Sequence, residues 1–184
     1  MKRILAIFAV LPSPALAHGG HMGHEAFLAG LTHPLGGADH LFAMVAVGLW
    51  AATLGGRGYW LLPTVFVVAM ALGGSLGAMG LPLPGVEPGI LASILVIGGA
   101  VSLAVKAHPL QAAAIVSFFG LLHGHAHGAE GPSSGLAVYA AGFVLTSMAL
   151  HLLGLLAGRA LHAAALRAAG GATVLGALAL AIGG

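Results

Sequence analysis

The chain contains no cysteine and very little charge. Its 184 residues include six Lys or Arg and only four Asp or Glu, so that 5% of the residues are charged. The absence of thiols excludes disulfides, zinc–thiolate sites and thiol nucleophiles. The small excess of base, a formal net charge of +2, is too sparse for a nucleic-acid-binding surface. A soluble domain of this length would also need far more polar surface than this composition supplies.

Hydrophobic residues and histidine are abundant instead. Hydrophobic residues make up 59% of the chain, and 31 residues are glycine. The mean hydropathy is +1.06, which is typical of a membrane protein. The 11 histidines outnumber all Lys, Arg, Asp and Glu together. We therefore expect an all-α polytopic membrane protein whose main partner is the lipid bilayer.

The amino terminus has the pattern of a secretory signal. Lys2 and Arg3 form a basic n-region, and residues 4–11 form an apolar h-region. A small-x-small cleavage sequence ends at Ala17. The alternative is an uncleaved first helix, but eight apolar residues before Pro12 are too few to span a bilayer. The sequence therefore predicts a signal peptide over residues 1–17.

Six apolar stretches follow the signal, and each is long enough to cover about 30 Å of hydrocarbon. A His-rich segment over residues 18–34 precedes them, and residues 35–184 form the expected six-helix transmembrane domain. Glycine- and proline-containing breaks separate the stretches. The expected spans lie near residues 35–55, 59–80, 88–106, 109–128, 135–157 and 164–183.

The placement of basic residues orients these spans. If the mature amino terminus lies outside, every mature Lys and Arg falls in a cytoplasmic loop, whereas the opposite loops carry only acids. This distribution satisfies the positive-inside rule. We expect a bacterial inner-membrane protein with both termini in the periplasm. The basic residues are Arg57, Lys106, Arg159 and Arg167.

Three spans followed by three spans would run in opposite directions across the membrane. An inverted 3+3 arrangement, which many secondary transporters use, is compatible with this count. The internal similarity is faint, because each half only carries a His-rich acidic motif in its first span. A six-helix bundle without symmetry is the alternative.

The first motif is HPLGGADH, from His33 to His40. These two histidines are seven residues apart, so that a regular helix would present them on one face, with Pro34 in its first turn. Two adjacent glycines would loosen that turn. Asp39 could ligate a metal ion, orient the second nitrogen of a histidine, or accept a proton. Met44 could add a soft ligand, or it packs in the apolar interior.

The second motif is HGHAHGAE, in which His123, His127 and Glu130 form one stripe of two imidazoles and a carboxylate. Two histidines four residues apart on a helix can hold one metal ion. His125 lies off this stripe. Beside the stripe, a row of small residues allows a neighbouring helix to approach closely. That row consists of Gly120, Gly124 and Gly128.

Both motifs are expected at the same face of the membrane, because the first span starts outside and the fourth span ends outside. Ionisable groups at membrane depth are costly and usually mark a site or pathway. Imidazole and carboxylate together suit borderline divalent metals. One ion could therefore meet ligands from both motifs. Alternatively, these residues cap helix ends and hydrogen-bond one another.

With both motifs, the chain resembles the HupE/UreJ family of small membrane proteins. The family pattern H-x5-D-H is matched by His33, Asp39 and His40. An F-H-G-x-A-H-G-x-E-like pattern is matched from His123 to Glu130, with Leu122 in place of the Phe. The resemblance implies a secondary permease for nickel or cobalt that supplies hydrogenase or urease and works with their maturation proteins. It implies no catalytic activity and no prosthetic group.

The remaining histidines have less certain roles. His18, His21 and His24 could capture metal outside the membrane, or they belong to a passive tail. His151 lies within the fifth expected span and is either a second site along the path or a buried, hydrogen-bonded histidine.

Two other functions stay open at this stage. Histidine and aspartate could hold a catalytic zinc in an intramembrane hydrolase, although no serine or cysteine nucleophile accompanies the motifs. The chain could also bind metal as an accessory protein without transporting it. The sequence has no P-loop, so ATP is not expected to drive transport directly.

Overall fold

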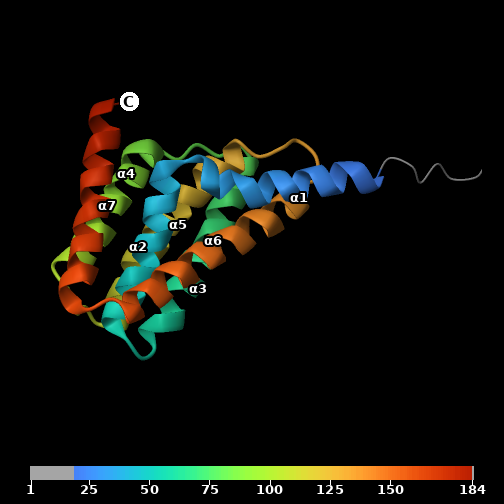
Figure 1. Ribbon diagram of the computed structural model, residues 1–184. Coiled ribbons are helices and arrows are strands. Elements are labelled where there is room, and N and C mark those ends of the chain that lie inside the picture. Colours follow the sequence, from blue (N-terminus) through green and yellow to red (C-terminus); the bar gives the residue numbers. More distant parts are fainter. Residues whose placement is uncertain (1–18, 184) are drawn as a thin grey trace, which may run out of the picture.

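The computed structural model describes residues 19–183, with side chains from residue 23 onward. The expected signal peptide and His18 lie outside the described residues. Within the described part, the chain forms seven helices and no strand (Figure 1). These are α1 (Gly19–Gly36), α2 (Ala38–Leu54), α3 (Gly58–Ala78), α4 (Val86–Ser102), α5 (Pro109–Ala129), α6 (Leu136–Ala160) and α7 (Ala163–Gly183).

Helices α2 to α7 coincide with the six expected apolar stretches to within four residues at each end. Three of them, α3, α6 and α7, are long and apolar enough to cross a membrane. The bent pair α1 and α2 would add a fourth span if it crosses as one unit, and α4 is a shorter apolar helix. Length and apolarity therefore establish three to four candidate spans, fewer than the six expected.

Helix α1 covers most of the His-rich segment expected before the first span. It lies across the upper end of the bundle in Figure 1 and packs along α6. The two backbones touch at Gly30, where a methyl group would overlap the Tyr139 carbonyl oxygen. Thr146 Oγ1 also donates a hydrogen bond to the Leu31 carbonyl at 2.8 Å. The small and apolar residues between the histidines make this packing face, which the histidine pattern conceals.

The chain bends by 82° between α1 and α2. The expectation that His33 and His40 share one face of a single helix is therefore wrong, because they lie on different helices. Pro34 is in the last turn of α1 and not in the first turn of a span. Gly37 separates the two helices with extended backbone angles (φ −110°, ψ 125°). The adjacent glycines thus mark a break in the helix at the site itself.

Glycines determine how closely the helices pack. A methyl group at Gly124 of α5 would overlap the Met70 carbonyl of α3, and one at Gly128 would overlap the Gly74 carbonyl. The expected small-residue stripe on α5 is confirmed, because α3 lies directly against it and runs parallel to α5. Helices α2 and α6 make a second parallel pair, in which Gly48 meets the backbone of His151.

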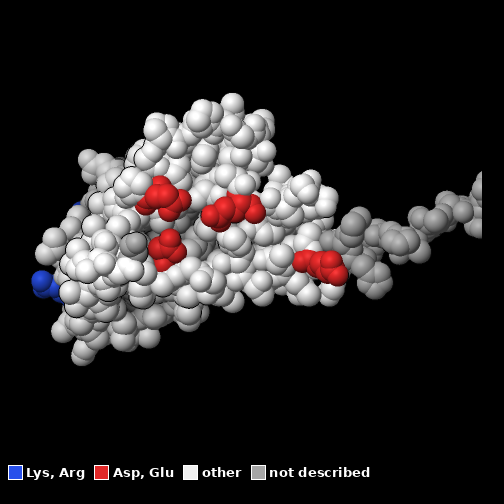
Figure 2. Space-filling model, turned by 90° about the horizontal axis from the view of Figure 1, so that it is seen from above, with Lys and Arg blue, Asp and Glu red and all other residues white. Residues whose placement is uncertain are grey.

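Charges of opposite sign lie at opposite ends of the bundle. Asp39 and Glu87 lie in the first turns of α2 and α4, and Glu130 follows the last turn of α5. These helix ends meet at the upper end of the bundle. Figure 2 shows acidic side chains spread over that face, with basic groups only at its margin. The basic residues belong to the loops and helix ends at the other end: Arg57, Lys106, Arg159 and Arg167.

Candidate metal centre

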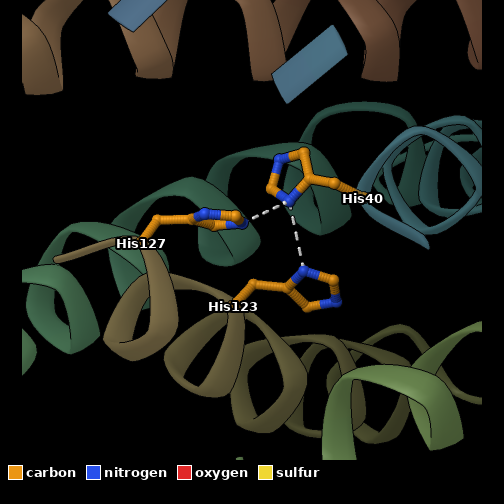
Figure 3. A group of neighbouring side chains, drawn as sticks. All are labelled: His40, His123 and His127. Atoms are coloured by element: carbon orange, nitrogen blue, oxygen red, sulfur yellow. Dashed lines mark hydrogen bonds between the residues drawn. The ribbon is translucent and has the colours of Figure 1, made fainter. Parts of the chain in front are cut away.

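Three histidines converge inside the bundle, and we refer to His40, His123 and His127 as the inner triad (Figure 3). His40 Nδ1 lies 3.0 Å from His127 Nε2 and 3.3 Å from His123 Nδ1. Two nitrogens that ligate one ion at about 2.1 Å lie about 3.0–3.4 Å apart for bond angles between octahedral and tetrahedral values. The nitrogens therefore already have the spacing of a metal site. His40 and His123 are at most 1% exposed.

Serine hydroxyls orient the two deepest rings. Ser93 Oγ donates its only hydrogen to the Ile90 carbonyl at 2.6 Å. The same oxygen lies 2.9 Å from His123 Nε2 and must therefore accept a hydrogen bond from it. His123 Nδ1 is then unprotonated, and its lone pair faces His40 Nδ1. In the same way, His40 Nε2 lies 3.5 Å from Ser147 Oγ, so that His40 Nδ1 is the nitrogen that faces the other two histidines.

A second set of ligands lies nearer the surface, and we refer to His33, His127 and Glu130 as the outer group. His33 Nε2 lies 2.9 Å from His127 Nδ1. Glu130 Oε2 lies 3.5 Å from His33 Nε2 and 3.4 Å from His127 Nδ1. His127 belongs to both sets, offering Nδ1 to the outer group and Nε2 to the inner triad. The outer group forms where the end of α1, which carries His33, meets the end of α5, which carries His127 and is followed by Glu130.

Exposure falls steadily from the outer group to the inner triad. The side chain of Glu130 is 60% exposed, that of His33 33% and that of His127 18%. His127 also borders a cavity of about 340 Å³ between α3 and α6. The lining of that cavity is mostly apolar, so that it leaves space beside the His127 ring without competing ligands. The ligands thus form a graded series from the acidic face into the bundle.

Aromatic side chains of α3 and α6 enclose the imidazoles. The Phe143 ring lies 4.9 Å from the ring of His127 and 5.1 Å from that of His40. The Tyr139 ring contacts His33 edge-on at 5.8 Å. On the opposite side, the Phe66 ring lies 5.6 Å from the His123 ring. Together with the surrounding helices, these rings bury His40 and His123, while His127 keeps some exposure.

Asp39 contacts the backbone of its own helix. Its Oδ1 accepts a hydrogen bond from the backbone N–H of His40 at 2.7 Å, in the first turn of α2. It belongs to neither of the two groups of candidate ligands. The second nitrogens of His40 and His123 face serines and not Asp39. The carboxylate therefore pairs one of the free N–H groups at the start of the helix that carries His40, and it lies on the acidic face.

Several other candidate residues lie apart from the two ligand sets. His125 Nε2 donates to the Leu81 carbonyl at 2.7 Å, which ties α5 to the α3–α4 loop. Met44 is fully buried in the apolar core. His24 is exposed on α1, and the side chain of His21 lies outside the described part. His151 is fully buried deeper in the bundle.

The sequence pattern did not identify the supporting residues of the site. The sequence does not mark Ser93 and Ser147 as special, because single serines occur in many apolar helices. The available signal was that polar residues in a span usually face the bundle interior. The contact of Phe143 with two histidines carries no comparable signal, because aromatic residues are common in apolar helices.

Comparison with known proteins identifies the family of the chain. The family model described as HupE / UreJ protein matches residues 5–183 of the chain. Protein HupE of Rhizobium leguminosarum bv. viciae is 44% identical over 190 aligned positions, which cover 99% of this chain and 98% of that protein. No solved structure is significantly similar to the chain. The chain therefore belongs to the HupE/UreJ family.

Proposed function

We propose that the chain is a secondary permease that carries a divalent transition metal into the cytoplasm. Ni²⁺ is the proposed ion, and Co²⁺ is the second candidate. The observation that carries the proposal is the inner triad, which is three imidazoles converging within apolar helices. The role in nickel supply to hydrogenase or urease, and to their maturation proteins, is what the family resemblance implies.

The chemistry of the ligands favours a borderline divalent ion. Imidazole suits Ni, Zn and Cu, and Mg or Ca would require oxygen ligands. Thiolates, which select softer ions, are absent because the chain has no cysteine. Glu130 and Asp39 add negative charge at the entrance, which lowers the cost of bringing a dication toward the bundle. The inner triad would then bind the ion through uncharged imidazole nitrogens, so that no net negative charge opposes its release.

The shared histidine suggests how the ion moves inward. In the outer group an ion would bind His127 Nδ1, and in the inner triad it would bind Nε2 of the same ring. We propose that the ion exchanges ligands in this order as the His127 ring reorients into the adjoining cavity. The amino-terminal histidines, His18, His21 and His24, are proposed to gather the ion beforehand.

The proposed topology has six spans, α2 to α7, after a cleaved signal peptide. The segregation of acids and bases to opposite ends of the bundle supports it. The acidic end would face the periplasm of a bacterial inner membrane, together with both mature termini. Helix α1 would lie along that surface and not cross the membrane.

An inverted 3+3 arrangement is supported by the packing of the second helix of each half. Gly73 and Gly77 of α3 lie against the backbone of α5, which is the first helix of the other half. Gly154 and Gly158 of α6 lie in the same way against α2. Exchanging the halves therefore exchanges these two parallel pairs. The two histidine motifs do not follow this symmetry, because they lie at opposite ends of α2 and α5.

Uptake of radioactive nickel into cells tests the proposal. We expect His40→Ala and Glu130→Ala to reduce accumulation about tenfold or more, by analogy with the loss of groups that support metal sites. His125→Gln is the control. His125 lies on α5 near Glu130 but outside both ligand groups, and glutamine keeps a donor for the Leu81 carbonyl. Unchanged accumulation in both ligand variants would refute transport. Nickel binding by purified protein without uptake by the wild type would favour the accessory role.

A further inference from the structure

His151 is a polar side chain without a polar partner. It lies in the middle of α6, is fully buried, and neither ring nitrogen has a hydrogen-bonding partner among the described residues. A buried polar group left unpaired costs about 1–3 kcal/mol. Leucine or phenylalanine could fill the same space without that cost. The residue is therefore a poor choice for packing alone.

Its position continues the series of ligands inward. His151 follows Ser147 by four residues, so both lie on one face of α6, and Ser147 lies beside His40 of the inner triad. Because α6 runs from the acidic end to the basic end of the bundle, His151 is one turn closer to the basic end. A group at this depth lies beyond the inner triad for an ion that enters from the acidic face.

The ring of Phe66 contacts both His151 and one histidine of the inner triad. It lies 5.2 Å from the His151 ring and 5.6 Å from the His123 ring. Phe66 is itself fully buried. The backbone of His151 rests against Gly48 of α2, while its ring faces Phe66 of α3. One aromatic ring therefore touches both the His151 ring and the His123 ring.

We propose that His151 is an inner binding group for the transported divalent cation, which it receives from the inner triad past the Phe66 ring. This inference rests on the proposed function and extends it by one site. The step is a ligand exchange, in which a metal–nitrogen bond to the inner triad breaks as one to His151 forms. Its lone pair is available because no described residue occupies either nitrogen.

Purified full-length protein in proteoliposomes tests this inference, with Ni²⁺ as the probe. Two quantities are measured for each variant, the equilibrium affinity for Ni²⁺ and the initial rate of Ni²⁺ entry. We expect His151→Leu and His151→Gln to bind Ni²⁺ like the wild type, because the inner triad is intact. Entry should slow by about tenfold or more, as expected for loss of a group in a metal path.

Leu155→Met, one turn further along α6, is the matched control and should leave both quantities unchanged. His151→Leu should melt no lower than the wild type, because it removes an unpaired polar group. Entry at the wild-type rate in both His151 variants would overturn the inference and leave the proposed function standing. Loss of affinity together with entry would also overturn it, by giving His151 a structural role. A wild type that neither binds nor admits Ni²⁺ would instead overturn the proposed function.

Discussion

At the scale of single residues, a serine decides which nitrogen of a histidine is available to an ion. Ser93 gives its hydrogen to the Ile90 carbonyl and accepts one from His123 Nε2. That arrangement leaves His123 Nδ1 unprotonated and facing His40. Groups of this kind fix the tautomer and orientation of metal-binding imidazoles. The supporting hydroxyl is therefore part of the site even though it would not touch the ion.

We expect Ser93→Ala to weaken Ni²⁺ binding by about 10–100-fold, the usual cost of losing such a supporting group. Thr53→Ala is the control, because Thr53 also donates to a carbonyl of its own helix but lies at the other end of α2 from His40. Isothermal titration of both purified variants makes the comparison. Equal affinity in Ser93→Ala and wild type would show that the hydroxyl does not orient His123.

The histidines could be predicted from the sequence, and their supporting residues could not. His33, His40, His123, His127 and Glu130 are ionisable groups in apolar surroundings, and this contrast marks them without a structure. Ser93 and Phe143 acquire their roles only through contacts between helices far apart in the sequence. Nothing in their local sequence distinguishes them from residues that merely pack.

At the scale of elements, the break between α1 and α2 positions the first motif. The break places His33 and His40 on two helices, yet both rings meet His127. Asp39 stabilises the start of α2 by accepting the N–H of His40. In a continuous helix through Gly37, the two histidines would lie two turns apart along one axis, and their rings could not both contact the His127 ring.

The hydrogen bond of Asp39 can be separated from its charge. Asparagine keeps an oxygen that accepts the His40 N–H, and alanine does not. We expect Asp39→Ala to lower the free energy of unfolding by about 0.5–1.5 kcal/mol, the usual worth of one hydrogen bond, and Asp39→Asn to lower it less. Thermal melting of the purified variants measures the difference. Equal destabilisation by both substitutions would show that the charge, and not the hydrogen bond, supports the start of α2.

The contact between α3 and α5 holds the second motif in place. Gly124 lies between His123 and His127 in sequence and touches the Met70 backbone of α3. We expect Gly124→Leu to force these helices apart and to destabilise the protein by about 1–3 kcal/mol, as overpacking usually does. The loss should extend to Ni²⁺ binding, because both histidines move with the helix.

Gly99→Ala is the matched control for this substitution, because a methyl group there meets nothing within 4 Å. Alanine at this helical position should leave the protein as stable or slightly more stable. Melting curves of the two variants decide the matter. A Gly124→Leu protein that melts with the wild type would contradict the close approach of α3 and α5.

At the scale of the whole molecule, charge segregation gives the bundle two distinct ends. Acids lie at the end that carries the outer group, and bases lie at the other. In the proposed topology, the basic end faces the cytoplasm, as the positive-inside rule requires. An ion from the periplasm would then meet Glu130 and His33 first.

Because the chain has no native cysteine, single cysteines can report this orientation without background. Ser134 is exposed in the α5–α6 loop at the acidic end, and Leu161 is 40% exposed between α6 and α7 at the basic end. We expect a membrane-impermeant maleimide to label Ser134→Cys in intact cells. Leu161→Cys should react only after permeabilisation. The reverse pattern would invert the proposed topology.

Composition and apolar runs predict most of the architecture. The six stretches between the glycine and proline breaks became α2 to α7, because the need to satisfy backbone hydrogen bonds in lipid leaves helices as the natural solution. The sequence does not reveal the full length of helix α1, since its histidines disguise a face that packs on α6. The bend at Gly37 likewise depends on that packing. Tertiary contacts therefore account for what the sequence pattern did not reveal.

The most direct measurement is a crystal structure of the nickel-loaded protein with anomalous scattering recorded at the nickel edge. We expect a peak at about 2.1 Å from His40 Nδ1, His123 Nδ1 and His127 Nε2. A peak bound only by the exposed amino-terminal histidines, with the inner triad empty, would contradict the account.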